Sequence, residues 1–248
     1  MPALPRDLAM RLAADEYDCF VAQLRGLAAD DWSRPTACAE WDVHAMSAHV
    51  LGMADFAASV PERLRQAIAA RRAGGLFIDA LTAVQVRKHR GRSPATIVER
   101  MAEAAPSAAA GRRRTPGLLR RLPMGGQPVD GQGVQTETWT LGYLNDVILT
   151  RDTWMHRSDI AAATGREMTL SAEHDGVLVA DVVAEWAARH GQPCRLVLTG
   201  PAGGDWTFNG AVAAAAAAPV HEVDAVEFCR ILSGRGNGTG LLATRVPF

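Results

Sequence analysis

The chain has 248 residues, of which 48% are hydrophobic and 21% are charged, so it can bury a sizeable core. Its formal net charge is -1, which provides no basic field to attract nucleic acid or an anionic membrane, and we expect neither as a partner. The four cysteines are far apart and form neither a C-x-x-C pair nor a dense disulfide framework. This pattern favours a reducing, cytoplasmic compartment.

Other features of composition exclude further classes. Charged residues interrupt the N-terminal 20 residues, so no signal peptide is expected, and the longest apolar run, AVAAAAAAPV, is too short to span a bilayer. Of the 26 basic residues only Lys88 is a lysine, and it lies outside any G-x-x-x-x-G-K context, which argues against P-loop and Schiff-base chemistry. The excess of arginine, alanine and glycine suggests a GC-rich bacterial genome.

Helical periodicity dominates the first part of the chain. Apolar residues recur at helical spacing from about Leu8 to Leu27, and a second helix begins after Asp42, a plausible N-cap. The segment LFIDALTAVQVRKHR predicts a third helix, and Pro94 after Ser93 opens another helical segment.

A basic segment with proline and glycine, RRRTPGLLRRLPMGGQPVDGQG at 112–133, interrupts this pattern. We interpret it as a long solvated loop, with a rim that grips an anionic ligand as the alternative. The clearest helix of the chain then runs from Thr140 to Gly165. The helices up to residue 167 predict a four-helix bundle.

The pattern changes after Gly165. Residues 171–191 predict a helix, 194–210 two strands around a glycine turn, 224–235 a helix and 240–246 a last strand. We therefore expect an α+β protein, with a helical bundle over residues 1–167 and a smaller α/β domain over residues 168–248.

The long helix carries polar residues on its apolar stripe. Steps of four from Ile148 reach Asp152 and then His156, so both side chains are expected to point inward. A carboxylate buried without a partner costs roughly several kcal/mol, so an ion pair, a hydrogen-bond network or a metal cation must compensate it.

The second helix presents His49 between Met46 and Met53 on its apolar face. His44 lies five positions earlier, about 140° away on the helical wheel, and is expected to face water. A lone histidine on an apolar face is more often an ordinary core residue, but three ligand-type residues on two inward faces weaken that interpretation. Nitrogen and oxygen donors of this kind suit a borderline divalent ion such as zinc, and three protein ligands leave a position open for catalysis.

Two other motifs are weaker. GRGNGTG, from Gly234, follows a helix, whereas a dinucleotide-binding fingerprint must follow a strand, so we reject that function for it. Cys38 beside Trp41 could be a nucleophile, but no activating base is near in sequence, and a buried structural cysteine is favoured.

Four segments carry a family resemblance: CAEWDVHAMSAHVLG, RDTWMHRSDIAAATGR, VDAVEFCRILSGR and the closing VPF. With their W-(x)7-H and H-x-x-D patterns, they resemble the mycothiol-dependent maleylpyruvate isomerase family of the DinB-like superfamily. The resemblance covers essentially the whole chain. It implies a DinB-like four-helix bundle that holds a divalent metal, usually zinc, followed by a small α/β domain.

The resemblance also implies roles for particular residues. The family's metal ligands correspond to His49, Asp152 and His156, although the family pattern has glutamate where this chain has Asp152. Arg235, in the SGR of the C-terminal motif, is expected to pair with a substrate carboxylate or with the thiol cofactor, and Arg87 is a weaker candidate for the same role. A surface role is the alternative for each arginine.

These roles imply an enzyme in which mycothiol, bound through its sulfur, attacks a small electrophile. An activated cis-alkene would be isomerised, and any other electrophile would be conjugated as in an S-transferase. Two alternatives stay open: a repurposed tailoring enzyme of secondary metabolism, and a non-catalytic metal- or ligand-binding protein. The shorter carboxylate of Asp152 leads to the hypothesis that the chain is transferase-like or repurposed rather than a maleylpyruvate isomerase.

Overall fold

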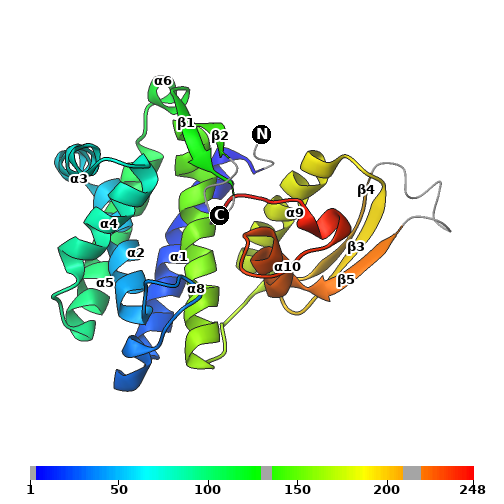
Figure 1. Cartoon of the computed structure of the whole chain (residues 1–248), viewed down its shortest axis with the longest axis horizontal. Helices are drawn as coiled ribbons and strands as arrows, with labels where there is room; N and C mark the ends of the chain where they lie inside the picture. Colours follow the sequence, from blue (N-terminus) through cyan, green and yellow to red (C-terminus); the bar gives the residue numbers. More distant parts are fainter. Residues whose placement is uncertain (1–3, 130–135, 209–218) are drawn as a thin grey trace. The chain divides into compact units, whose positions relative to one another are not determined.

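The computed structural model describes residues 4–129, 136–208 and 219–248. It contains two compact units (Figure 1). The helical unit comprises Arg6–Gln127 and Thr138–Met168, and the C-terminal unit comprises Met1–Pro5, Pro128–Glu137 and Thr169–Phe248. Among the described residues, no helix combines the length and the apolar character needed to cross a membrane.

Four helices form the bundle of the helical unit: α1 (Arg6–Arg25), α2 (Val43–Ala58), α5 (Pro94–Arg113) and α8 (Leu149–Thr164). α2 packs against α5 and α8, and α1 packs against the same two helices. Their shared core is fully buried and includes Phe20, Met46, Leu51, Ile97 and Ile160. The predicted α+β fold with an N-terminal bundle is therefore confirmed.

The predicted helix starts follow from their capping residues. The Asp42 carboxylate accepts a hydrogen bond from the backbone N–H of Ala45 (2.7 Å), and the Ser93 hydroxyl accepts one from Thr96 (3.2 Å). Each cap satisfies a backbone donor that has no partner inside its helix. Pro94 occupies the first turn of α5, where its missing N–H has no cost.

A helix that the sequence did not reveal, α3 (Val60–Ala73), follows α2 directly. Its only buried residues are Gln66 and Ala70, whereas the apolar Val60, Leu64 and Ile68 are exposed. An inward apolar stripe is therefore missing, which explains why periodicity gave no signal. α4 (Phe77–His89) packs against α2 and α3 rather than inside the bundle.

The long loop expected at 112–133 is only partly correct. α5 continues to Arg113, and α6 (Gly117–Arg120) and β1 (Pro123–Pro128) follow, with β1 pairing with β2 (Thr136–Thr140). Arg112 is fully buried. Its guanidinium donates hydrogen bonds to the carbonyl of Asn145 (2.9 Å) and to the hydroxyl of Thr150 (2.6 Å), which compensate for the loss of contact with water. The many arginines of this segment had suggested that Arg112 would be exposed to solvent. Residues 130–133 lie outside the described residues.

The long helix that was expected after Thr140 is continuous but not regular. It consists of α7 (Leu141–Tyr143), a π-helical turn (Leu144–Ile148) and α8, and it ends at Gly165, whose φ of 69° lies in the left-handed region. Turns of π-helix inside α-helices occur frequently at functional sites. This one lies directly before the turn of α8 that carries Asp152.

The C-terminal unit contains a π-helical turn (Ala172–Gly176), α9 (Val177–His190), α10 (Ala225–Leu232) and a three-stranded sheet of order β4-β3-β5. β3 (Cys194–Thr199) pairs antiparallel with β4 (Gly204–Phe208) and parallel with β5 (Val220–Asp224). The expected strand at 240–246 is wrong, because Gly240–Ala243 forms a 3-10 turn whose Leu241 carbonyl accepts a hydrogen bond from the Trp186 indole (3.0 Å). The third strand of the sheet is instead β5, which the sequence analysis did not predict.

Candidate metal centre

His49 on α2 and Asp152 and His156 on α8 lie together in the bundle. The Nε2 atom of His49 is 3.6 Å from Oδ2 of Asp152, and Nε2 of His156 is 3.5 Å from Oδ1 of the same carboxylate. The two imidazole rings are 5.3 Å apart and nearly perpendicular. The structure thus brings together the three residues that the sequence had singled out.

Burial differs among the three side chains. Those of His49 and His156 are about 95% buried, since 6% and 5% of their surface is exposed, whereas 25% of the Asp152 side chain is exposed. Trp41, from the turn before α2, packs against both histidines, with ring centres 5.1 Å from His49 and 6.0 Å from His156. The cluster is therefore shielded on the tryptophan side and accessible at Asp152.

A second carboxylate contacts the other nitrogen of the His156 ring. Oδ2 of Asp159, whose side chain is fully buried, lies 3.3 Å from Nδ1 of His156. This contact leaves the Nε2 atom directed toward Asp152. Carboxylate contacts of this type commonly fix the ring orientation of metal-binding histidines.

The donor set fits a divalent metal ion. One donor atom from each of His49, Asp152 and His156 lies within 4.8 Å of the other two. Two imidazole nitrogens and a carboxylate oxygen are zinc-type ligands, and Nδ1 of buried His49 has no hydrogen-bond partner among the described residues. Three ligands leave at least one coordination position for a further molecule.

Cys38 is less buried than the sequence predicted. It is half-buried in the turn between Thr36 and Trp41, and its sulfur lies within 4.8 Å of ligand atoms of His156 and Asp159. His156 and Asp159 lie more than 100 residues from Cys38 along the chain, so only the fold brings them close to its sulfur.

The remaining candidates belong to other segments of the chain. Arg87 is exposed on α4, and Arg235 is half-buried in the turn after α10, where its backbone N–H donates to the carbonyl of Arg230 (2.9 Å). His44 was expected to face water, but it is half-buried and its Nε2 lies 2.8 Å from the carbonyl of Arg92. The helical wheel could not show this contact, because Arg92 belongs to the segment between α4 and α5.

Sequence reasoning assigned no role in this cluster to Trp41 or Asp159. The available signal for Asp159 was its position three residues after His156, which places both on one face of α8. Trp41 gave no such signal, because it precedes α2 and its position depends on the turn that carries it.

The fold and the cluster define a four-helix-bundle protein with a candidate centre of two histidines and one carboxylate. The family model described as the mycothiol maleylpyruvate isomerase N-terminal domain matches residues 13–161, which is more than half of the chain. The chain therefore belongs to this family.

Solved structures agree on the fold. The chain is similar to the crystal structure of the mycothiol-dependent maleylpyruvate isomerase, with a TM-score of 0.55 and 16% identity over 94% of this chain and 90% of that one. It is also similar to a histidine-to-alanine mutant of the mycothiol-dependent maleylpyruvate isomerase, with a TM-score of 0.52 and 15% identity over the same shares. A search of curated proteins found no match.

Proposed function

We propose that the protein is a metal-dependent enzyme that uses mycothiol, a low-molecular-weight thiol, to act on a small electrophile. The convergence of His49, Asp152 and His156 carries this proposal, because it combines a zinc-type donor set with an open coordination position. Family membership supports the choice of mycothiol, and zinc is the ion that we expect.

When bound, a divalent ion supplies charge that lowers the pKa of a coordinated thiol and so increases its reactive fraction at neutral pH. The protein's residues prepare the place for it. His49 and His156 provide nitrogen donors, Asp152 provides a carboxylate oxygen, and Asp159 fixes the orientation of the His156 ring. Trp41 excludes water from one side of the cluster.

The electrophile decides the net reaction. Addition of the thiol to an activated cis-alkene, rotation about the former double bond and elimination of the thiol would give isomerisation. With other electrophiles the adduct is the product, and the protein is an S-transferase. We propose Arg235, with Arg87 as the weaker candidate, as the cation that pairs with an anionic group of the substrate or the thiol. We also propose a cytoplasmic location, where such thiols stay reduced.

A repurposed tailoring enzyme or a non-catalytic metal- or ligand-binding protein is the second candidate. It is favoured by Asp152, which is one methylene shorter than the glutamate of the family pattern, and by the low identity of 16% to the isomerase structure.

The metal proposal is tested by elemental analysis of the purified protein and of two variants, His49→Ala and His156→Ala. We expect about one divalent ion per chain in the wild type and a large loss in both variants. His44→Ala is the matched control, because His44 lies on the same helix and contacts the Arg92 carbonyl instead. Full metal occupancy in both ligand variants would show that the ligand set is wrong.

A thiol-consumption assay with mycothiol and a panel of electrophiles tests the reaction separately. Consumption that depends on bound metal supports the enzyme. A protein that holds its metal but consumes no thiol with any electrophile would favour the second candidate.

A further inference from the structure

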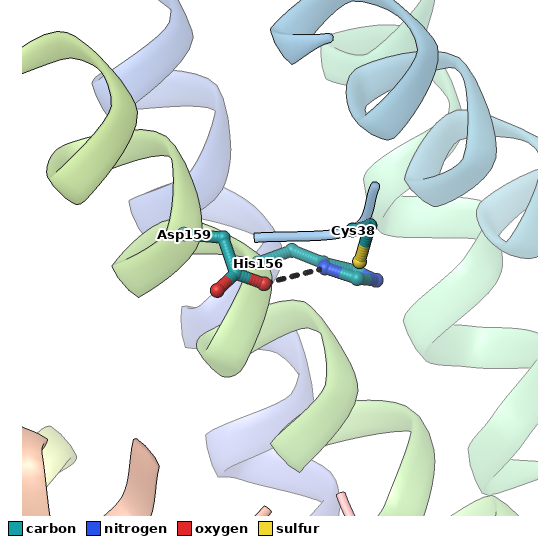
Figure 2. Close-up of side chains that lie close together, drawn as sticks. All are labelled: Cys38, His156 and Asp159. Carbon is teal, nitrogen blue, oxygen red and sulfur yellow. Dashed lines mark hydrogen bonds and ion pairs between the residues drawn. The ribbon is translucent and has the colours of Figure 1, made fainter. Parts of the chain in front are cut away.

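Cys38 brings a sulfur donor close to the metal-binding face of α8. Figure 2 shows its side chain beside those of His156 and Asp159, with Cys38 contributed by the turn before α2 and the other two by α8. One ligand atom of each residue lies within 4.8 Å of the other two. These residues form a mixed sulfur, nitrogen and oxygen set that includes neither His49 nor Asp152.

Hydrogen bonds of the turn fix the backbone around Cys38. Its N–H donates to the hydroxyl of Thr36 (3.2 Å), and its carbonyl accepts from the N–H of Trp41 (2.8 Å). The N–H of Thr36 in turn donates to the carbonyl of Trp41 (3.0 Å). Little ordering of the backbone is therefore needed to present the thiol, which favours ligand binding at this position.

The burial pattern fits a cation site with one accessible donor. Asp159 is fully buried and supplies a negative charge, His156 is 4% exposed, and Cys38 is half-buried, so an ion can approach from its side. Thiolate ligands favour thiophilic ions over hard ions such as magnesium or calcium. We propose that Cys38, His156 and Asp159 form a second metal-binding set, which takes a thiophilic divalent ion and shares His156 with the first set.

Sharing one imidazole couples the two sets. His156 contacts Asp152 through Nε2 (3.5 Å) and Asp159 through Nδ1 (3.3 Å). An ion held by Cys38 and Asp159 competes with the contact between Asp159 and the His156 ring. Occupation of the second set therefore lowers the affinity of the first set for its metal ion. A thiophilic ion added beyond the amount that fills the first set then acts as an inhibitor. Only this inhibitory consequence rests on the proposed function, and the binding itself does not.

Titration with Co²⁺, followed by absorption spectroscopy on the full-length protein, separates the two sets. A sulfur-to-cobalt charge-transfer band reports ligation by a thiolate, whereas d–d bands report cobalt in either set. We expect the charge-transfer band in the wild type and in His49→Ala, which removes a ligand of the first set only. We expect its loss in Cys38→Ser, with the d–d bands retained.

Two further variants sharpen the test. Cys19→Ser is the matched control, because Cys19 is also half-buried and belongs to neither set, and it should keep the band. Asp159→Asn keeps the thiol but removes the charge, and it should raise the Co²⁺ concentration at half-saturation of the band by about tenfold or more. Circular dichroism of each variant checks that the fold is intact.

The outcomes distinguish the second set from the proposed catalytic centre. The inference is overturned if the wild type shows no charge-transfer band, if Cys38→Ser keeps it, or if His49→Ala loses it. If the band behaves as expected but Cys38→Ser binds no cobalt at all, the second set stands and the first set, on which the proposed function rests, fails.

Discussion

At the scale of single residues, we expect Asp159 to act on the first set through its contact with His156. The carboxylate is fully buried and 3.3 Å from Nδ1 of His156. Removal of its charge should therefore loosen the ring that presents Nε2 to the ion. Such outer contacts typically change metal affinity by about 10–100-fold.

We expect Asp159→Asn to weaken zinc binding by about 10–100-fold while the protein stays folded, because asparagine keeps the shape of the side chain. Competition with a chelator of known affinity measures the change. Asp79→Asn, at an exposed position of α4, is the control and should match the wild type. Equal affinities for all three proteins would contradict the role of Asp159.

The sequence predicted three donors of the centre but not their surroundings. Asp152 and His156 are four residues apart on one helix, and His49 lies on the apolar face of another between Met46 and Met53, so local helical patterns are enough to find all three. Cys38 and Trp41 reach the same place from a turn whose shape depends on hydrogen bonds across the Pro35–Asp42 bridge. No period in the sequence encodes that shape.

At the scale of elements, close packing within the helical unit depends on glycines of two helices. An ideal Cβ atom at Gly111 of α5 would lie 2.0 Å from the carbonyl oxygen of Ala57, and one at Gly52 of α2 would lie 2.5 Å from Cβ of Gln85. Only glycine permits these approaches of α2 to α5 and α4. Sequence patterns predicted the helices α2, α4 and α5 but not their partners, because packing depends on contacts that are remote in the chain.

Gly111→Ala should lower the free energy of unfolding by about 1–3 kcal/mol, because the new methyl group meets backbone that must move. This result would be opposite to the usual effect of alanine in a helix, which is stabilising by about 1 kcal/mol. Gly117→Ala is the control, since nothing lies within 4 Å of its Cβ position. Urea unfolding of the two variants gives the comparison, and equal stabilities would contradict the packing argument.

A polar cluster joins α2, α3 and α4. Lys88 contacts the carboxylate of Asp55 and lies 2.7 Å from that of Glu62. Burial by itself would raise the pKa of Glu62, but hydrogen bonds from Arg65, Lys88 and Gln66 outweigh it and lower the pKa from 4.5 to about 2. Because the folded pKa lies below the unfolded one, Glu62 stabilises the fold above about pH 4.5, and this contribution is lost as the pH falls toward 2.

We therefore expect Glu62→Gln to destabilise the protein by about 1–2 kcal/mol at pH 6, after allowance for screening by water, and by much less at pH 3. Unfolding in urea at both pH values measures the difference from the wild type. Glu99→Gln, at an exposed position of α5, is the control and should follow the wild type. A destabilisation that is the same at both pH values would show that the ion pairs with Glu62 are not its cause.

At the scale of the whole molecule, the candidate metal centre belongs to the helical unit, whereas Arg235 belongs to the C-terminal unit. We expect Arg235→Ala to keep its metal but to lose about 10–100-fold in kcat/KM, because charge-assisted hydrogen bonds contribute about 1.5–3 kcal/mol. Arg87→Ala tests the weaker candidate in the same assay. Unchanged kinetics of Arg235→Ala with every accepted electrophile would place Arg235 at the surface.

The reaction depends on the position of the bound metal ion relative to the thiol and the electrophile. Asp152 bears on this position, because the family that the chain resembles has glutamate there. Its shorter side chain would place a bound ion closer to α8, and displacement by about 1 Å can cost roughly a hundredfold in rate. We therefore expect conjugation of electrophiles such as epoxides, quinones or haloarenes, with little turnover of maleylpyruvate in the presence of mycothiol.

Parallel assays of these substrates, with the wild type and Asp152→Glu, measure this expectation. Lengthening the carboxylate should move the ion back and increase isomerisation relative to conjugation. Turnover of maleylpyruvate by the wild type at about 1 per second or faster, an ordinary enzyme rate, would contradict the hypothesis, and Asp152→Glu would then change little. Conjugation without isomerisation would support it, and metal binding without any thiol reaction would favour the repurposed enzyme or the non-catalytic binding protein.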